Sequence, residues 1–221
     1  MSMSWNNDQV SEVETKKILE LARECLGVPG DFVEFGCYKG DTSLLLAEVL
    51  RRDAMDCQSV IVENSVEKMG KSGGNDVKKW CENGEKVVKK LWIYDSFEGL
   101  PEKSGFDESV LGADFKGGEL FVTKREVKER FLRAGLPVPV IKKGWFSELT
   151  GEDLPRGIAF AFLDGDFYES IRDSLKLVAP RMSRGGVLVV HDYSNLALPG
   201  VRKAVEEWGG VEDGGYRVVL L

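Results

Sequence analysis

Acidic side chains follow two apolar runs in the last third of the chain. Phe160–Leu163 is followed by Asp164-Gly-Asp166, and Val187–Val190 is followed by His191-Asp192-Tyr193. Each run predicts a strand buried in a sheet, and the carboxyl ends of parallel strands meet where open α/β sheets bind their ligands. Unpaired charges at this rim are poorly solvated and therefore costly. Together these residues indicate a site that binds a metal ion or moves protons.

A glycine turn follows the first predicted strand and reads Glu34-Phe-Gly36-Cys-Tyr-Lys39-Gly40. Gly36 would let the backbone turn sharply beside a ligand, and Gly40 would let the next helix approach closely. The G-x-x-x-G spacing differs from the G-x-G-x-x-G of dinucleotide-binding folds, which weakens an NAD interpretation. A plain tight connection is the alternative. Lys39 could pair with a ligand carboxylate or be solvated.

Asp95 ends the next ordered strand, Leu91–Tyr94. An acid in this position is suitably placed to accept hydrogen bonds from both hydroxyls of a ribose. With the glycine turn beside it, Asp95 favours a nucleoside-containing cofactor over a simple connection.

The elements that must position these residues alternate along the chain. The strands are nearly all apolar, which predicts an α/β fold with a mainly parallel sheet and helices on both faces. Residues 1–30 read as an N-terminal helical segment, and residues 31–221 read as one domain. We predict strands over Asp31–Phe35, Leu91–Tyr94, Val138–Ile141, Ile158–Leu163, Gly186–Val190 and Tyr216–Leu221, and helices over Gln9–Cys25, Thr42–Arg51, Lys124–Arg133, Ser170–Val178 and Val201–Trp208.

Two segments are harder to interpret. Residues 52–90 are rich in Lys, Glu, Gly and Asn without a steady apolar period, and we interpret them as a surface insertion. Within them, Ser59–Val62 could be a strand and Val77–Lys90 a helix. The apolar end Val218–Leu221 would be an edge strand without a charged end. Either the chain is truncated or the last hairpin strand is missing.

The composition excludes several classes of protein. A length of 221 residues fits one α/β domain, and a formal charge of −7 argues against a nucleic-acid surface. No run approaches the roughly 18 apolar residues of a membrane span, and the start lacks a signal-peptide core. The four cysteines form no C-x-x-C pair, so neither a zinc site nor a disulfide framework is indicated. We expect a soluble cytoplasmic protein that binds neither nucleic acid nor membrane.

A series of motifs resembles one known family. They are, in chain order, Glu34–Gly40, Asp95-Ser-Phe-Glu-Gly-Leu-Pro101, Gly144-Trp-Phe146, Leu163-Asp-Gly-Asp-Phe-Tyr-Glu-Ser170, His191-Asp-Tyr193 and Pro199–Ala204. From about residue 30 to 208, apart from 52–90, the chain is similar to the macrocin O-methyltransferase (TylF-like) family of class I S-adenosylmethionine enzymes. The second and fourth motifs are specific, whereas many methyltransferases share the glycine turn. The resemblance implies a single Rossmann-like class I methyltransferase domain, with a shortened C-terminal hairpin as one alternative.

The resemblance also implies where S-adenosylmethionine binds. The glycine turn would approach the methionine part, Asp95 would hold the ribose, and Trp145 would flank the adenine, with a core lid as the alternative for the aromatic side chain. The residues expected at the cofactor are Glu34, Gly36, Lys39, Gly40, Thr42, Asp95, Ser96, Phe97, Gly144, Trp145 and Asp164.

A divalent cation, usually Mg²⁺, is the second implied cofactor. Carried over by motif position, its ligands are Asp164, His191 and Asp192, and Asp166 matches a position proposed as general base. His191 departs from the family pattern, because the antibiotic-sugar enzymes usually have an aspartate there. It is the only histidine in the chain. Imidazole shifts the preference from magnesium toward manganese, iron, nickel or zinc.

Plain structural roles remain open for the same residues. His191 could merely hydrogen-bond Asp164, with no metal bound. Asp166 could be the N-terminal cap of the helix that follows, a common role for aspartate. The glycine-rich loop from Ser96 to Gly118 suits a lid that excludes water, although a surface loop explains it equally well.

We therefore expect a metal-assisted O-methyltransferase acting on a hydroxyl of a small sugar-like or polyol metabolite. A metal bound to the hydroxyl would lower its pKa and fix its position, so that a nearby carboxylate could take the proton. The rivals are a catalytically silent S-adenosylmethionine-binding protein and a nucleotide-dependent oxidoreductase. The expected partner is the small-molecule hydroxyl acceptor, and a homo-oligomer is left open.

Overall fold

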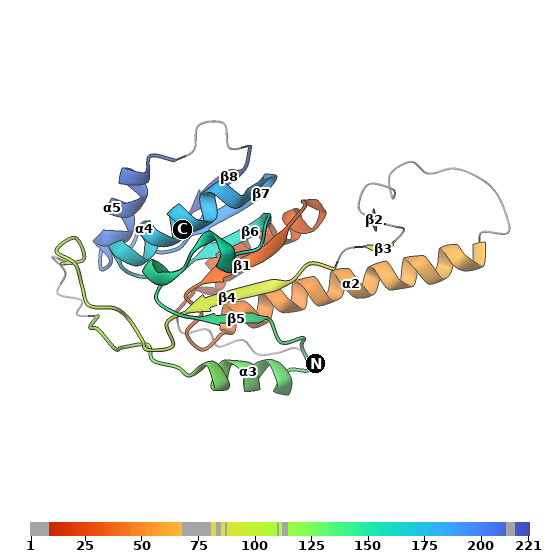
Figure 1. Cartoon of the computed structure of the whole chain (residues 1–221), viewed down its shortest axis with the longest axis horizontal. Helices are drawn as coiled ribbons and strands as arrows, with labels where there is room; N and C mark the ends of the chain where they lie inside the picture. The colour runs from red at the N-terminus through yellow and green to blue at the C-terminus, as the bar shows by residue number, and fades with distance from the viewer. Residues whose placement is uncertain are drawn as a thin grey trace.

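The computed structural model describes residues 9–67, 81–82, 85–86, 88–109, 111, 115–210 and 215–221, with the backbone alone for residues 56–67, 81–82 and 85–86. Helices and strands alternate through most of this length (Figure 1). The α-helices are α1 Glu12–Glu24, α2 Asp41–Glu67, α3 Lys124–Arg133, α4 Tyr168–Val178 and α5 Pro199–Trp208. The strands are β1 Asp31–Phe35, β2 Cys81–Glu82, β3 Glu85–Lys86, β4 Leu91–Asp95, β5 Val140–Lys143, β6 Ile158–Leu163, β7 Met182–Val190 and β8 Arg217–Leu220.

The main sheet has six strands in the order β5-β4-β1-β6-β7-β8. Each neighbouring pair is parallel. If these six strands are renumbered 1 to 6 in the order in which they occur along the chain, their order across the sheet is 3-2-1-4-5-6. This is the strand order of a doubly wound α/β sheet. The chain reverses direction across the sheet between β1 and β6, so a crevice is expected at the carboxyl ends of these two strands. The predicted α/β class and the mainly parallel sheet are confirmed.

Both faces of the sheet are covered by helices. Successive strand residues point to opposite faces, so Phe32 packs into the cluster with α1, α2 and α3, whereas Val33 packs into the cluster with α4 and α5. Figure 1 shows α4 and α5 on one side of the sheet and α2 and α3 on the other. All residues of β6 are fully buried, and burying one phenylalanine such as Phe160 contributes roughly 1.5–3 kcal/mol. β6 is therefore the centre of the core.

The first part of the insertion predicted at residues 52–90 is helical and continues α2. Ser59–Val62 lies inside α2, so the predicted strand there is wrong. The helix predicted over Thr42–Arg51 continues to Glu67, because neither glycine nor proline interrupts the sequence from Asp41 to Glu67. Figure 1 shows the second half of α2 extending beyond the sheet.

The prediction of a helix over Val77–Lys90 is also wrong for the residues of this segment that the structure describes. Cys81–Glu82 and Glu85–Lys86 form an antiparallel pair, β2 and β3. These strands flank the dipeptide Asn83-Gly84, which favours two-residue hairpin connections. Residues 77–80, 83–84 and 87 lie outside the described residues.

Other predicted elements are confirmed with shifted ends. β5 begins at Val140, two residues later than predicted, because Pro139 has no N–H for a strand ladder. β7 begins at Met182, four residues before the predicted start. Gly185 and Gly186 are unusual inside a strand, so the sequence pattern did not indicate that the strand extends to their N-terminal side. β8 pairs in parallel with β7 and forms the outer strand of the sheet.

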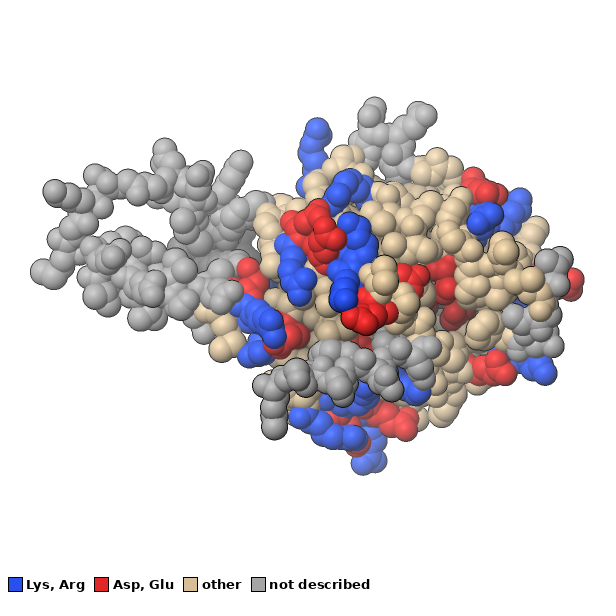
Figure 2. All heavy atoms as spheres, turned by 180° about the vertical axis from the view of Figure 1, so that it is seen from behind, with Lys and Arg blue, Asp and Glu red and all other residues tan. Residues whose placement is uncertain are grey.

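Acidic and basic side chains intermingle on the face seen in Figure 2, without a continuous basic stripe. Ion pairs such as Arg51–Glu48 on α2 and Arg125–Glu129 on α3 link opposite charges. Among the described residues, no helix combines the length and the apolar character needed to cross a membrane.

Candidate active site

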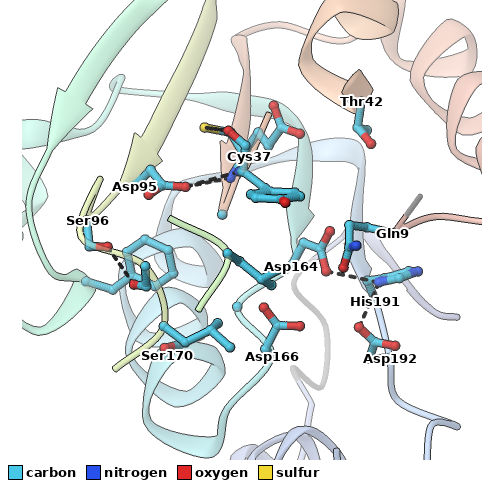
Figure 3. Close-up of a pocket in the computed structure, with 18 of the residues that line it drawn as sticks. Gln9, Cys37, Thr42, Asp95, Ser96, Asp164, Asp166, Ser170, His191 and Asp192 are labelled. Carbon is cyan, nitrogen blue, oxygen red and sulfur yellow. Dashed lines mark hydrogen bonds and ion pairs between the residues drawn. The ribbon is translucent and has the colours of Figure 1, made fainter. Parts of the chain in front are cut away.

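A pocket opens at the carboxyl ends of β1, β4, β6 and β7. Its wall is formed by the turn after β1, the start of α2, the segment after β4, Trp145 and Phe146, and the acids after β6 and β7. Figure 3 shows Asp95 on one side of this pocket and His191 on the other. The predicted site residues that line it are Glu34, Gly36, Lys39, Thr42, Asp95, Ser96, Trp145, Asp164, Asp166, His191 and Asp192. Gly40, Phe97 and Gly144 are not among the lining residues.

Strained backbone conformations gather around the pocket. A positive φ is found at Tyr38 (44°), Phe97 (52°), Leu120 (57°), Asp166 (59°) and Asp192 (60°). Four of these residues follow β1, β4, β6 and β7. Each such conformation costs of order 1–3 kcal/mol for a residue other than glycine, and it persists only where surrounding contacts enforce it. Such strain at four neighbouring strand ends is typical of a functional site.

Asp95 ties the turn after β1 to the segment after β4. One carboxylate oxygen accepts hydrogen bonds from the N–H groups of Cys37 (2.9 Å) and Tyr38 (3.3 Å), and the other accepts from Phe97 N–H (2.7 Å). The turn is further fixed at Gly36, where φ is 83° and a Cβ atom would lie 1.9 Å from the carbonyl oxygen of Asp164. Asp95 therefore organises the backbone of the pocket as well as facing into it.

Glu34 is almost completely buried, with 1% of its surface exposed. It accepts a hydrogen bond from the Ser43 hydroxyl of α2. Burial, reinforced by the negative charges of Asp164, Asp95 and Asp41, raises the pKa of Glu34 to about 8. This carboxyl is therefore mostly protonated at neutral pH.

Arg130 of α3 holds the start of α2 in place. Its guanidinium donates to the carbonyl oxygen of Lys39 and forms an ion pair with Asp41. The Lys39 ammonium lies 4.8 Å from the centre of the Tyr38 ring. Thr42, in the first turn of α2, is buried against the pocket.

Asp164, His191 and Asp192 form a compact cluster at the ends of β6 and β7. Nδ1 of His191 lies 3.0 Å from Asp164 Oδ1 and 2.9 Å from Asp192 Oδ2. Burial opposes a charge on the imidazole, but the two carboxylates outweigh it and raise the pKa of His191 to about 11. Burial raises the pKa of Asp164, whereas for Asp192 the hydrogen bond and charge of His191 overcome burial and lower its pKa.

The three side chains fit a divalent cation. Their potential ligand atoms all lie within 4.8 Å of one another. Neighbouring ligands around a six-coordinate ion with bonds of ~2.1 Å are ~3.0 Å apart, which is close to the spacing of Nδ1 from the two carboxylate oxygens. A donor set of one imidazole and two carboxylates suits manganese or another transition metal better than an all-oxygen site would.

Asp166 points into the same part of the pocket (Figure 3). The cap position of α4 belongs to Phe167, which has no side-chain cap bond. The alternative role of Asp166 as the helix cap is therefore wrong. Burial, followed by the charges of Asp164 and Asp192, raises the pKa of Asp166 well above its usual range.

Asp107 performs the capping that the sequence suggested for Asp166. Its Oδ1 accepts a hydrogen bond from the Tyr168 N–H at 2.7 Å, and its Oδ2 accepts from the N–H (2.9 Å) and hydroxyl (2.6 Å) of Ser104. Asp107 is 1% exposed, and Phe106 beside it lies 4.6 Å from the Tyr168 ring, centre to centre. The loop after β4 is thus docked on α4. Sequence reasoning missed Asp107, because its partner is 61 residues away.

The segment before α1 also reaches the pocket, where Gln9 and Val10 line its wall. Sequence reasoning missed both residues. The amphipathic pattern of the first helix indicates that this segment packs on the sheet, but not which strand end it meets.

Comparison with known proteins shows several similar methyltransferases. The 8-demethyl-8-(2,3-dimethoxy-alpha-L-rhamnosyl)-tetracenomycin-C 4'-O-methyltransferase of Streptomyces olivaceus is 31% identical over 191 residues, covering 83% of this chain and 59% of that protein. The demethyldecarbamoylnovobiocin O-methyltransferase of Streptomyces niveus is 27% identical over 203 residues, covering 87% of this chain and 65% of that protein. The chain therefore spans about three fifths of the length of the curated relatives it matches.

A solved structure described as the O-methyltransferase NovP superposes with a TM-score of 0.63 and 26% identity, covering 88% of this chain and 69% of that one. The arrangement of helices around a parallel sheet is therefore that of an α/β methyltransferase. Residues 77–213, more than half of the sequence, match the family described as Macrocin-O-methyltransferase (TylF). The chain belongs to this family.

Proposed function

We propose that the chain is an S-adenosylmethionine-dependent O-methyltransferase that methylates a hydroxyl of a sugar-like or polyol metabolite with the help of a divalent cation. The observation that carries this proposal is the acidic character of the pocket. Its acidic side chains are Asp41, Asp95, Asp164, Asp166, Asp192 and the mostly protonated Glu34, with Lys39 and His191 as the basic residues. A lining of this sign complements the positive sulfonium of S-adenosylmethionine and a metal cation.

The turn after β1 argues against a nicotinamide cofactor. In dinucleotide-binding folds, backbone N–H groups at the corresponding turn face the negatively charged pyrophosphate. Here the N–H groups of Cys37 and Tyr38 donate to the Asp95 carboxylate. A pyrophosphate would have to displace this carboxylate, and its charge would face the other acids of the pocket.

The names of the relatives support a sugar-like acceptor. The name of the Streptomyces olivaceus relative specifies a 4'-O-methyltransferase of a rhamnosyl-bearing compound. A sugar hydroxyl is a weak nucleophile near neutral pH, and a bound divalent cation supplies a lower hydroxyl pKa and a fixed position for the oxygen. Asp164, His191 through Nδ1, and Asp192 are the residues that would hold the cation.

The remaining chemistry falls to residues of the chain. Methyl transfer is an in-line displacement: the acceptor oxygen bonds to the methyl carbon while the carbon–sulfur bond breaks and its electron pair stays on sulfur. Asp166, whose side chain points into the pocket, is the carboxylate that would take the hydroxyl proton, and it would do so in its ionised form. The walls of the pocket align the two reactants, which accounts for a large part of such a rate.

Transfer of labelled methyl groups tests the proposal. The chain would be incubated with methyl-labelled S-adenosylmethionine, Mg²⁺ or Mn²⁺, and a panel of rhamnosyl-bearing acceptors. We expect a methyl ether product that is lost in chelator, and a decrease of at least about 100-fold for Asp164→Asn. The matched control is Asp173→Asn, since Asp173 pairs with Arg172 on α4 and does not line the pocket.

Two other results of this experiment would change the proposal in different ways. Full transfer in the presence of chelator would refute the metal step and keep the methyltransferase. Saturable S-adenosylmethionine binding without transfer to any acceptor would favour the catalytically silent binding protein.

A further inference from the structure

We propose that Glu14 of α1 is a positioning residue for His191. In this proposal Glu14 accepts a hydrogen bond from Nε2–H of the imidazole and keeps Nδ1 directed at Asp164 and Asp192, where the divalent cation would bind. The inference rests on the cation site of the proposed function and adds a residue from outside the sheet to that site.

The two nitrogens of His191 face different surroundings. Nδ1 is shared between Asp164 and Asp192, as described above. Nε2 points the other way, and its nearest carboxylate oxygen is Oε1 of Glu14 at 3.7 Å. Nε2 is buried and has no hydrogen bond to any residue that the structure describes. A buried donor without a partner costs of order 1–3 kcal/mol, so a partner is expected beside it.

Glu14 is held in the orientation that this role requires. Ser11 is the N-cap of α1, and Glu14 completes a capping box with it. Oε2 of Glu14 accepts hydrogen bonds from the N–H (3.0 Å) and the hydroxyl of Ser11. The cap therefore occupies one carboxylate oxygen and leaves Oε1 facing His191. A movement of roughly 1 Å or less would bring Oε1 and Nε2 to hydrogen-bond distance.

This arrangement decides which nitrogen can bind a metal. A cation bound between the two aspartates would displace the proton that Nδ1 shares with them, and the imidazole would then carry a single proton on Nε2. The carboxylate of Glu14 beside Nε2 favours the proton there and leaves the lone pair of Nδ1 for the cation. Histidines that bind metals commonly donate their second N–H to such a carboxylate, and removing it typically lowers metal affinity 10–100-fold.

The single histidine makes the test direct. The ¹⁵N spectrum of labelled protein contains one imidazole, so its two ring nitrogens need no assignment among other histidines. With Zn²⁺ bound, we expect Nε2 to be protonated and Nδ1 to show the shift of a metal-bound nitrogen. A spectrum with Zn²⁺ on Nε2 would overturn the inference without any variant.

Metal titration provides the second measurement. Glu14→Gln removes the charge and keeps the capping box, because glutamine serves at this position as well as glutamate. We expect this variant to bind Mn²⁺ and Zn²⁺ 10–100-fold more weakly than the unchanged chain. The control is Glu20→Gln on the same helix, whose side chain is exposed and paired with Lys17, and its affinity should not change.

The outcomes separate the inference from the proposed function. Unchanged metal affinity in Glu14→Gln, with binding still abolished in Asp164→Asn, overturns the role of Glu14 alone. Absence of Mn²⁺ and Zn²⁺ binding by the unchanged chain overturns both the cation site and the role of Glu14. Weaker binding in Glu14→Gln together with Nε2 protonation in the unchanged chain supports the inference.

Discussion

The carboxylates around the pocket have different hydrogen-bond partners and different burial, and these surroundings determine the role of each one. Asp95 is bonded to three backbone N–H groups and fixes the shape of the site. Glu34 is buried beside Ser43, where its neutral form is favoured. Asp164 and Asp192 share Nδ1 of His191. The same functional group thus serves as a structural tie, a neutral hydrogen-bond partner and a potential metal ligand.

The buried state of Glu34 predicts how stability depends on pH. Its pKa is about 8 in the folded protein against an ordinary 4.5, so between these values the folded form holds a proton that the unfolded form has lost. The contribution of Glu34 to the free energy of unfolding therefore falls as pH rises from about 4.5 to about 8, by about 1.4 kcal/mol per pH unit, and levels off above. Glu34→Gln cannot titrate and should flatten this dependence.

Urea unfolding at pH 5, 6.5 and 8 measures this effect. Relative to the unchanged chain, Glu34→Gln should gain stability as pH rises, whereas Glu20→Gln on exposed α1 surface should follow the unchanged chain. Parallel pH profiles for the unchanged chain and Glu34→Gln would show that Glu34 is ionised in the folded protein.

Among the elements, the connections after the strands do most to shape the site. The turn after β1 contacts the end of β6 through Gly36, and Asp95 binds that turn from β4. The loop after β4 is docked on the start of α4 through Asp107. Four strand ends that are far apart in the sequence thereby form one pocket.

Gly36→Ala should disrupt this meeting of strand ends. The added Cβ would lie 1.9 Å from the carbonyl oxygen of Asp164 at a φ of 83°. We expect the free energy of unfolding to fall by at least about 1–3 kcal/mol, and the affinity for S-adenosylmethionine to fall with it. Gly27→Ala is the control, since a Cβ there meets nothing within 4 Å, and it should change stability by less than about 0.5 kcal/mol. Equal stability of the two variants would contradict the close approach at Gly36.

Asp107→Ala should loosen the loop after β4. The substitution leaves the Tyr168 N–H and both donors of Ser104 without their acceptor, which predicts a loss of about 1–3 kcal/mol in the free energy of unfolding. Limited proteolysis should then cut the loop faster. Glu108→Ala changes the exposed neighbour and should behave like the unchanged chain. Identical cleavage rates for both variants would refute docking through Asp107.

The elements also show how far the sequence predicts the structure. Apolar runs ending in acids located β4, β6 and β7 and brought Asp95, Asp164 and His191 to one pocket, because burial in a parallel sheet leaves few other arrangements. The extension of α2 was missed, since its apolar period fades although no residue breaks the helix. Asp107 was missed for another reason: side chains that meet through tertiary folding leave no local pattern. The start of α4 is capped by Asp107 instead of Asp166, and only the tertiary contact between the loop after β4 and α4 decides this.

For the whole molecule, the doubly wound sheet explains why one edge collects these residues. β1 and β6 lie side by side at the point where the strand order reverses, and the following connections diverge to opposite faces and leave a crevice. α1 and the segment before it complete the crevice by bringing Glu14, Gln9 and Val10 to the end of β7. The fold thus assembles an acidic pocket in the position expected for a nucleoside cofactor.

The most direct test of this account is isothermal titration of the chain with S-adenosylmethionine and, separately, with NAD. Because the pocket is lined by carboxylates and Asp95 occupies the N–H groups of the turn, we predict saturable binding of one S-adenosylmethionine per chain and no binding of NAD. Saturable binding of NAD, with none of S-adenosylmethionine, would contradict the account.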